Sequence, residues 1–275
     1  MSKIILASCA VAALLLLFAL SSARADAVDC KPSGAPPSST GVVLVHGKMD
    51  TTGYWLMPLR RKLQATGFRA ASPEMPWAEK RQYDRTYEQS LDIIADAARE
   101  LEHQGAKRIV VAGHSLGANA ALGYGALHDQ VGGIIVISPG QFPEDAGYQK
   151  VVGESVAKAR QLIAAGQGDR IGLFKDFAQW NGNLEGARTT ARNYLSYFDP
   201  NGNAVMPKNA KRIKPGTPVL WVVGSEDSGN VSDGKSYSYD KAPPDRLSRY
   251  ILVPKGHDEA PATGADQIVS WLKCL

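Results

Sequence analysis

The 275-residue sequence has little of what several protein classes require. Its three cysteines are too few for a disulfide scaffold, and they show no Cys/His spacing of a zinc site. The net charge of +4 is too close to neutral for a typical nucleic-acid-binding protein. No Gly-x-Gly-x-x-Gly follows an expected strand, which argues against a dinucleotide cofactor. We therefore expect a globular protein with no metal, no cofactor and no nucleic-acid partner.

Apolar runs long enough to cross a membrane are absent after the N-terminal region. There, Lys3 precedes the apolar run Ile4–Leu20, and Ala23-Arg24-Ala25 follows it. This order of a cation, an apolar run and a small-x-small site is typical of a cleaved signal peptide. We predict a signal peptide over residues 1–25 and a single domain over 26–275. The mature protein is expected to be periplasmic or secreted, without stable membrane insertion; an uncleaved anchor is the alternative.

Two cysteines remain after the expected cleavage, Cys30 and Cys274, one near each end of the mature chain. In an exported protein, two such thiols are expected to form a disulfide. Two unpaired thiols near the chain ends are the alternative.

Short apolar runs rich in β-branched residues recur along the chain. Because their apolarity is continuous rather than alternating, they indicate strands buried on both faces, as in a parallel sheet. The runs are Val42–Val45, Arg108–Ala112, Val131–Ile137, Val219–Val223 and Tyr250–Val253, with a weaker one at Phe68–Ser72. Helical patterns occupy residues 54–66, 85–104, 118–127 and 262–273. This alternation predicts an α/β fold with an open, mostly parallel sheet flanked by helices.

Residues 140–215 separate two expected strands by about 75 positions, more than an ordinary crossover needs. We expect one helix packed on the sheet and an inserted cap in this interval. Eight of the aromatic residues lie between positions 140 and 200. They fit a lid that covers a substrate, and they fit equally a small core beneath a long insertion.

The segment Gly113-His114-Ser115-Leu116-Gly117 follows one expected strand and opens an Ala-rich helical stretch. A serine on such a sharp strand-to-helix turn is held in a strained conformation with its hydroxyl exposed. The flanking glycines let the strand and helix approach closely. The helix N-terminus presents backbone N–H groups to a developing anion.

With this motif, the sequence resembles the α/β-hydrolase superfamily from about Thr40 to the C-terminus, in particular exported bacterial-type members that are serine esterases or lipases. The resemblance implies that Ser115 is the nucleophile and that His257, in Lys-Gly-His-Asp, is the general base. It implies that Asp227, after the strand at 219–223, orients the histidine.

Three other carboxylates remain open as the acid. Glu226 is adjacent to Asp227, Asp199 lies in the expected cap, and Asp258 follows His257. Successive residues of an extended turn face opposite sides, which favours Asp227 over Glu226.

The segment His46-Gly47-Lys48 resembles the second oxyanion turn of the same family. It implies an oxyanion hole formed by the backbone N–H groups of Lys48 and Leu116. His46 and His114 lie beside glycines in turn motifs, where we expect a structural or pocket-lining role. We expect the Lys48 ammonium to be a solvated surface charge rather than a group that attracts acidic substrates. The short segment before Val42 leaves no room for a leading hairpin, so the sheet should be short.

These residues together predict a serine hydrolase that cleaves a carboxylic ester of a small or medium acyl substrate through an acyl-enzyme. A peptidase or an acyltransferase would use the same three residues. A non-catalytic binding protein of the same fold is a further alternative, because a fold alone does not establish a function.

Overall fold

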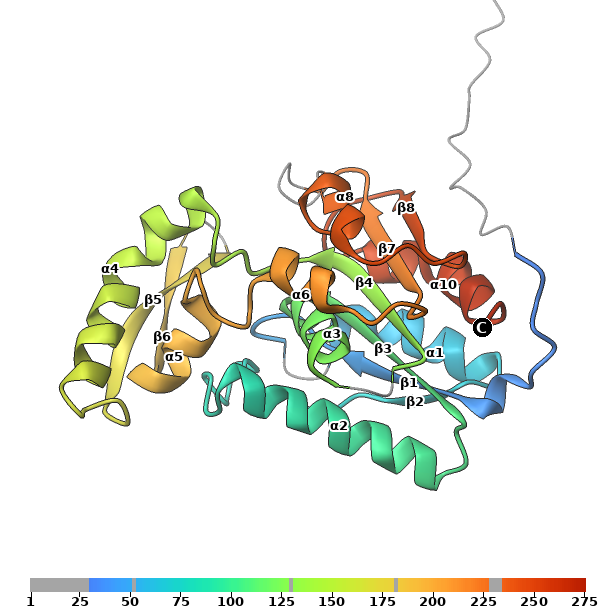
Figure 1. The fold of residues 1–275 in the computed structure, drawn as a ribbon, viewed down its shortest axis with the longest axis horizontal. Helices are drawn as coiled ribbons and strands as arrows, with labels where there is room; N and C mark the ends of the chain where they lie inside the picture. The colour runs from blue at the N-terminus through green and yellow to red at the C-terminus, as the bar shows by residue number, and fades with distance from the viewer. Residues whose placement is uncertain (1–29, 51–52, 129–130, 181–182, 228–233) are drawn as a thin grey trace, which may run out of the picture.

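The computed structural model describes residues 30–275 except 51–52, 129–130, 181–182 and 228–233 (Figure 1). The expected signal peptide at residues 1–25 lies outside the described residues. Within the described part of the chain, no helix is both long enough and apolar enough to cross a membrane.

A six-stranded sheet forms the centre of the fold, and every pairing in it is parallel. The strands are β1 (Thr40–Val45), β2 (Arg69–Ala71), β3 (Arg108–Ser115), β4 (Gly133–Pro139), β7 (Val219–Gly224) and β8 (Arg249–Val253). Their order is β2-β1-β3-β4-β7-β8. The expected α/β class and parallel sheet are confirmed, because each predicted apolar run forms a strand.

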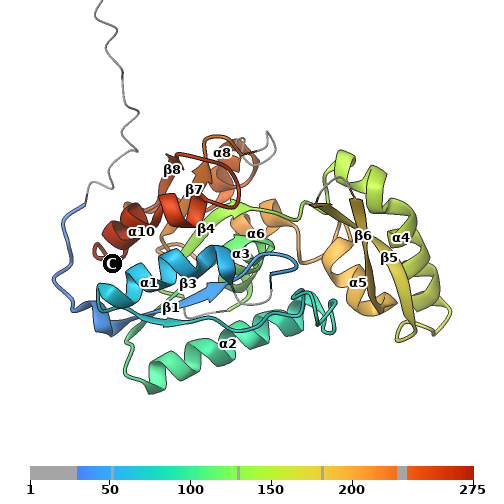
Figure 2. The same cartoon turned by 180° about the vertical axis from the view of Figure 1, so that it is seen from behind.

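Helices cover both faces of this sheet (Figures 1 and 2). Apart from the helices within residues 146–198, the α-helices in the described part of the chain are α1 (Met57–Ala65), α2 (Tyr87–His103), α3 (Leu116–Leu127), α6 (Met206–Arg212), α8 (Gly234–Tyr237), α9 (Ala260–Thr263) and α10 (Ala265–Leu272). Alternate strand residues point to opposite faces. Val43 and Val45 therefore pack in the core that contains α2 and α3 side chains. Val42 and Leu44 pack in the core that contains α1 and α10 side chains.

A separate lobe stands at one end of the sheet (Figures 1 and 2). It consists of α4 (Ala146–Ala164), β5 (Ile171–Trp180), β6 (Asn183–Thr190) and α5 (Ala191–Phe198), and we call it the cap lobe. β5 and β6 form an antiparallel hairpin apart from the main sheet, which the sequence analysis did not anticipate. The expected sheet-packing helix is also different: α4 packs within the lobe against α5 and β5, while α6 packs against α3.

Aromatic side chains fill the interior of the cap lobe. Phe174 stacks on Tyr194 with ring centroids 4.6 Å apart, and Tyr194 stacks on Phe198 at 4.2 Å. Tyr148 and Tyr197 are also buried. Five of the eight aromatics noted in the sequence are therefore buried in a core that the lobe shares with the main body, where Tyr197 packs against aromatic rings of the body.

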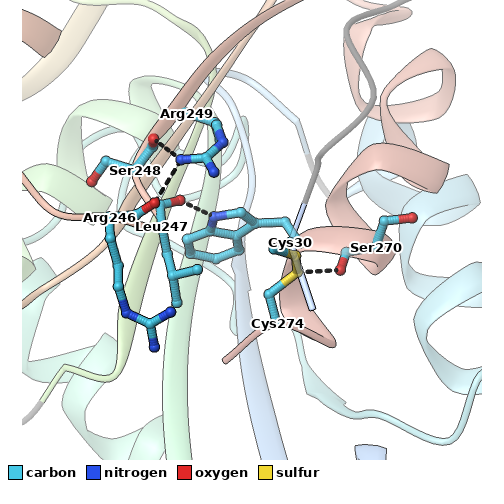
Figure 3. Close-up of a disulfide and its surroundings, with 8 residues drawn as sticks. Cys30, Arg246, Leu247, Ser248, Arg249, Ser270 and Cys274 are labelled. Atoms are coloured by element: carbon cyan, nitrogen blue, oxygen red, sulfur yellow. Dashed lines mark hydrogen bonds between the residues drawn. A yellow bond between two sulfur atoms is a disulfide. The ribbon is translucent and has the colours of Figure 1, made fainter. Parts of the chain in front are cut away.

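A disulfide joins Cys30 to Cys274, with the Cα atoms 5.9 Å apart (Figure 3). It ties the beginning of the described chain to the end of α10. Nearby, the Ser33 N–H donates to the Lys273 carbonyl at 2.9 Å. The two segments are thus held together by a covalent bond and by a backbone hydrogen bond.

Candidate active site

Ser115 lies at the sharp turn between β3 and α3. Its backbone has φ 56° and ψ −122°, a region that residues other than glycine rarely adopt. The surrounding backbone imposes this conformation by close packing. A Cβ on Gly113 would overlap the carbonyl group of Gly117, and a Cβ on Gly117 would overlap the carbonyl oxygen of Val45. These are the features of a nucleophile elbow.

Gly140 borders the Ser115 hydroxyl from the loop that follows β4. An ideal Cβ at position 140 would lie 2.7 Å from Ser115 Oγ and 3.4 Å from the Leu116 nitrogen. The missing side chain therefore leaves space beside the hydroxyl and the first amide of α3. The sequence analysis did not identify this glycine, although its place just after an expected strand was a usable indication.

Asp227 and His257 come from the carboxyl ends of the neighbouring strands β7 and β8. The Glu226 N–H donates to the Lys255 carbonyl at 3.0 Å, which ties the two loops together. His257 Nδ1 lies 3.2 and 3.1 Å from the two carboxylate oxygens of Asp227. The Asp227 side chain is 3% exposed and that of His257 33%. A carboxylate at Nδ1 favours the tautomer with its proton there, which leaves Nε2 able to accept a proton.

The three alternative acids are placed differently. Glu226 is exposed, and Asp199 is held in an ion pair by an arginine of α4 at 2.8 Å. Burial raises the pKa of the Asp258 carboxyl. Within the described residues, His257 forms a hydrogen bond with Asp227 and with none of these three.

Ser115 Oγ and His257 form no hydrogen bond with each other in the described part of the chain. The His257 ring lies against the His114 ring, with centroids 4.9 Å apart. In ligand-free enzymes, catalytic hydrogen bonds are often long and tighten only when substrate binds. The arrangement thus pairs Asp227 with His257 beside the serine turn, without a serine–histidine hydrogen bond among the described residues.

His114 holds the loop that carries His257. Its Nε2 lies 2.9 Å from the His257 carbonyl oxygen, and because a carbonyl only accepts, Nε2 must carry the ring proton. Burial lowers the pKa of His114 to about 3, so the ring is neutral at ordinary pH. Its Nδ1 is buried and has no hydrogen-bond partner among the residues described.

His46 organises the turn after β1. Its Nε2 accepts the Met75 N–H at 2.9 Å, so Nδ1 carries the proton and donates to the Gly47 carbonyl at 2.7 Å. The Trp77 indole N–H donates to the His46 carbonyl at 2.9 Å. Desolvation lowers the pKa of His46. Gly47 in turn lies beside Ser115, so this turn abuts the serine.

The Lys48 side chain is not the solvated surface charge expected from the sequence. It is 12% exposed, and its Nζ donates to Asp176 Oδ1 at 2.6 Å and to the Phe177 carbonyl at 3.2 Å. Both partners lie on β5 of the cap lobe. The sequence offers no local indication of this pair, because 128 positions separate its members.

Comparison with known proteins agrees with this geometry. The family model described as "Alpha/beta hydrolase family" matches residues 42–269. The chain belongs to the alpha/beta hydrolase family. A search of curated proteins found no match.

Solved structures similar to this hydrolase include lipases and esterases. A monoacylglycerol lipase from Paleococcus ferrophilus is 22% identical, with a TM-score of 0.62 over 87% of this chain and 96% of the other. A thermostable carboxyl esterase from Bacillus coagulans is 16% identical, with a TM-score of 0.58 over 88% and 92%. Est1E from Butyrivibrio proteoclasticus, solved with ferulic acid bound, is 18% identical, with a TM-score of 0.55 over 89% and 96%. At these identities the likeness concerns the fold.

One group of potential metal ligands lies at the same site of the hydrolase. Atoms of His114, His257 and Asp258 lie within 4.8 Å of one another. However, His114 Nε2 already donates to a carbonyl, and His257 Nδ1 is bonded to Asp227. We therefore interpret His114 and His257 as parts of a hydrogen-bonded hydrolase site and derive no metal-dependent step from this group.

Proposed function

We propose that this hydrolase cleaves carboxylic esters of small or medium acyl substrates, with Ser115 as nucleophile, His257 as general base and Asp227 as the group that orients the histidine. The observation that carries the proposal is the buried Asp227 carboxylate at His257 Nδ1, beside a serine in strained backbone. This combination supplies a proton acceptor and the hydroxyl of a partly exposed serine at one edge of the sheet.

In the first half of the reaction, His257 Nε2 removes the proton from the Ser115 hydroxyl as the oxygen attacks the ester carbonyl carbon. Asp227 stabilises the resulting imidazolium without itself becoming protonated. The tetrahedral intermediate then breaks its bond to the alkoxy group. His257 gives its proton to that leaving oxygen, which departs as the alcohol and leaves the acyl group on Ser115.

In the second half, water attacks the acyl carbon while His257 takes one of its protons. The bond to Ser115 Oγ breaks, the serine oxygen recovers a proton from His257, and the carboxylic acid leaves. In both halves the negative carbonyl oxygen is placed at the backbone N–H groups of Lys48 and Leu116. Such preorganised donors each contribute on the order of 10²–10³ in rate.

The contacts of Lys48 indicate whether the site requires an acidic substrate. Its ammonium is engaged by Asp176 and is only 12% exposed. We therefore infer that Lys48 contributes its backbone N–H rather than its charge, and that substrate recognition there does not require an acidic group.

Hydrolysis of p-nitrophenyl esters with acyl chains of increasing length tests the proposal. The wild-type protein should hydrolyse the shorter esters, and Ser115→Ala should be slower by about 10³–10⁶ while its circular dichroism is unchanged. Retention of a tenth of the wild-type rate by Ser115→Ala would reject Ser115 as nucleophile. A wild-type protein that cleaves peptide substrates but no ester would instead be a peptidase.

We also propose that the protein is exported after cleavage between residues 25 and 26. The N-terminal apolar run with its small-x-small site supports this, as does the disulfide between Cys30 and Cys274, since disulfides persist in oxidising compartments. N-terminal sequencing of protein recovered from outside the cytoplasm should begin at Asp26. An N-terminus at Met1 in that fraction would contradict it.

A further inference from the structure

Lys48 joins the proposed oxyanion turn to the cap lobe. Its Nζ contacts Asp176 Oδ1 at 2.6 Å, with the two side chains only 12% and 4% exposed. The same Nζ lies 5.6 Å from the centroid of the Phe198 ring. A charge this deeply buried is strongly unfavourable without its partner. The position of the lysine side chain is therefore set by the cap lobe.

Tyr83 also joins the body of the protein to the lobe, at the same carboxylate. Its hydroxyl donates to Asp176 Oδ2 at 2.8 Å, and burial raises its pKa well above the usual value, so it remains a donor. Its carbonyl accepts from Thr189 Oγ1 at 2.6 Å and from Asn193 Nδ2 at 2.9 Å. Tyr83 has φ 59°, which a bulky residue keeps only where its surroundings impose it.

Tyr83 is connected back to the turn after β1. Its N–H donates to the Pro76 carbonyl at 2.6 Å, and the adjacent Trp77 carbonyl accepts the Met49 N–H at 3.0 Å. The Trp77 indole holds the His46 carbonyl. Contacts from the cap lobe therefore reach residues 46–49 by two routes, through the Lys48 side chain and through the segment that contains Trp77.

We propose that Asp176 and Tyr83 are positioning residues, which hold Lys48 so that its backbone N–H points into the oxyanion hole when the cap lobe is docked. This inference rests on the proposed function, because it assigns that N–H to the hole. Hydrolysis then requires a docked lobe. If the lobe moved away, Lys48 would lose its partners on β5, and its backbone N–H would no longer be held toward the oxyanion hole.

The kinetics of Asp176→Asn test this role, because the backbone N–H of Lys48 is still present in the variant. We expect kcat to fall about 10- to 100-fold, since small misplacements of a catalytic donor have effects of this size. KM should stay within about threefold, because the oxyanion donor acts on the transition state. The matched control is Glu154→Gln, which removes the charge of Glu154 on α4. Glu154 forms an exposed ion pair with Lys175, the residue before Asp176 on β5. This control should change neither constant by more than about twofold.

A double variant distinguishes two explanations of a slow Asp176→Asn enzyme: loss of the bonds that position Lys48, and an unpaired charge left buried at Lys48. Lys48→Met with Asp176→Leu removes both charges and keeps apolar volume, a replacement that folded proteins often tolerate. We expect its kcat to be reduced about as much as in Asp176→Asn, because the directional bonds to β5 are lost. Wild-type kcat in this double variant, or a change in KM alone in Asp176→Asn, would overturn the proposal. The double variant also serves if Asp176→Asn does not fold.

Hydrogen exchange provides a readout that is independent of activity. In Asp176→Asn, amides of residues 46–50 should exchange at least about tenfold faster than in the wild type, while those of α10 should be unchanged. Equal exchange of residues 46–50 in both proteins would overturn the inference even if no ester substrate were found. Absence of esterase activity in the wild type together with faster exchange would reject the proposed function and would still support the positioning of Lys48 by Asp176.

Discussion

His257 Nδ1 lies within hydrogen-bond distance of both carboxylate oxygens of Asp227, at 3.2 and 3.1 Å. The carboxylate is almost fully buried, whereas the imidazole is a third exposed. The pair therefore has one buried member and one that is accessible from solvent, as the proposed role of His257 as general base requires.

We predict that Asp227→Asn lowers kcat by about 10⁴, because an amide at Nδ1 favours the wrong imidazole tautomer. Asp199→Asn and Asp258→Asn are the controls, and each should stay within about tenfold of the wild type, as expected of carboxylates outside the proposed triad. Steady-state ester hydrolysis by the three purified variants measures this. A severe loss in Asp199→Asn with a mild one in Asp227→Asn would assign the acid to the cap lobe.

The neutral, buried His114 should make the fold sensitive to acid. Its pKa is about 3 in the folded protein against 6.5 as a free side chain, so below pH 6.5 the unfolded chain binds a proton that the folded chain does not. The free energy of unfolding therefore falls as the pH is lowered. Between pH 7 and pH 5 this loss is about 2 kcal/mol.

His114→Gln should reduce that loss, because glutamine does not titrate and its amide can still donate to the His257 carbonyl. Urea unfolding of both proteins at pH 7 and pH 5 compares the two losses directly. His46, whose pKa is also lowered by burial, adds a contribution of the same sign in both proteins and cancels in the comparison. An identical pH dependence for the variant and the wild type would show that His114 binds its proton equally in the folded and unfolded states, and would contradict a lowered pKa in the folded protein.

Loss of the disulfide should destabilise the protein without changing its catalytic constants. Cys30 and Cys274 are 244 positions apart, and the chain-entropy model gives a contribution of roughly 5 kcal/mol at most for so long a loop. We expect the double variant Cys30→Ser/Cys274→Ser to lose about 2–5 kcal/mol in urea unfolding. The reduced wild type is the matched control and should behave alike. A loss below about 0.5 kcal/mol in both would mean that the link does not restrict the unfolded chain.

The sheet could be predicted from the sequence because parallel strands buried on both faces leave continuous apolar runs, as at Val42–Val45 and Val219–Val223. The hairpin of the cap lobe could not be predicted in this way. β5 interrupts its apolar residues with Lys175 and Asp176, and β6 is largely polar. Such strands are specified by their pairing with each other and by the tertiary core into which Phe174 and Ala187 pack, rather than by a run of apolar residues.

The candidate site likewise has residues that could be predicted from the sequence and residues that could not. Ser115, Asp227 and His257 each follow an expected strand, so the topology of a parallel sheet places them at one edge. The partners of Lys48 follow no such rule, because the ion pair with Asp176 depends on how a separate lobe packs on the turn. Gly140 was missed for a related reason: its importance lies in the space beside Ser115 Oγ, which is defined only when β3 and β4 are paired.

Labelling with a fluorophosphonate shows directly whether Ser115 is an activated nucleophile. The reagent forms a bond from its phosphorus to the serine oxygen and releases fluoride, so the experiment needs no knowledge of the natural substrate. We expect one adduct per wild-type chain, found by peptide mass spectrometry on the segment that contains Ser115. We expect no adduct in Ser115→Ala and a rate at least about 100-fold lower in His257→Gln, because the base would be missing. An unlabelled wild-type protein, or an adduct that persists in Ser115→Ala, would show that Ser115 is not the activated nucleophile.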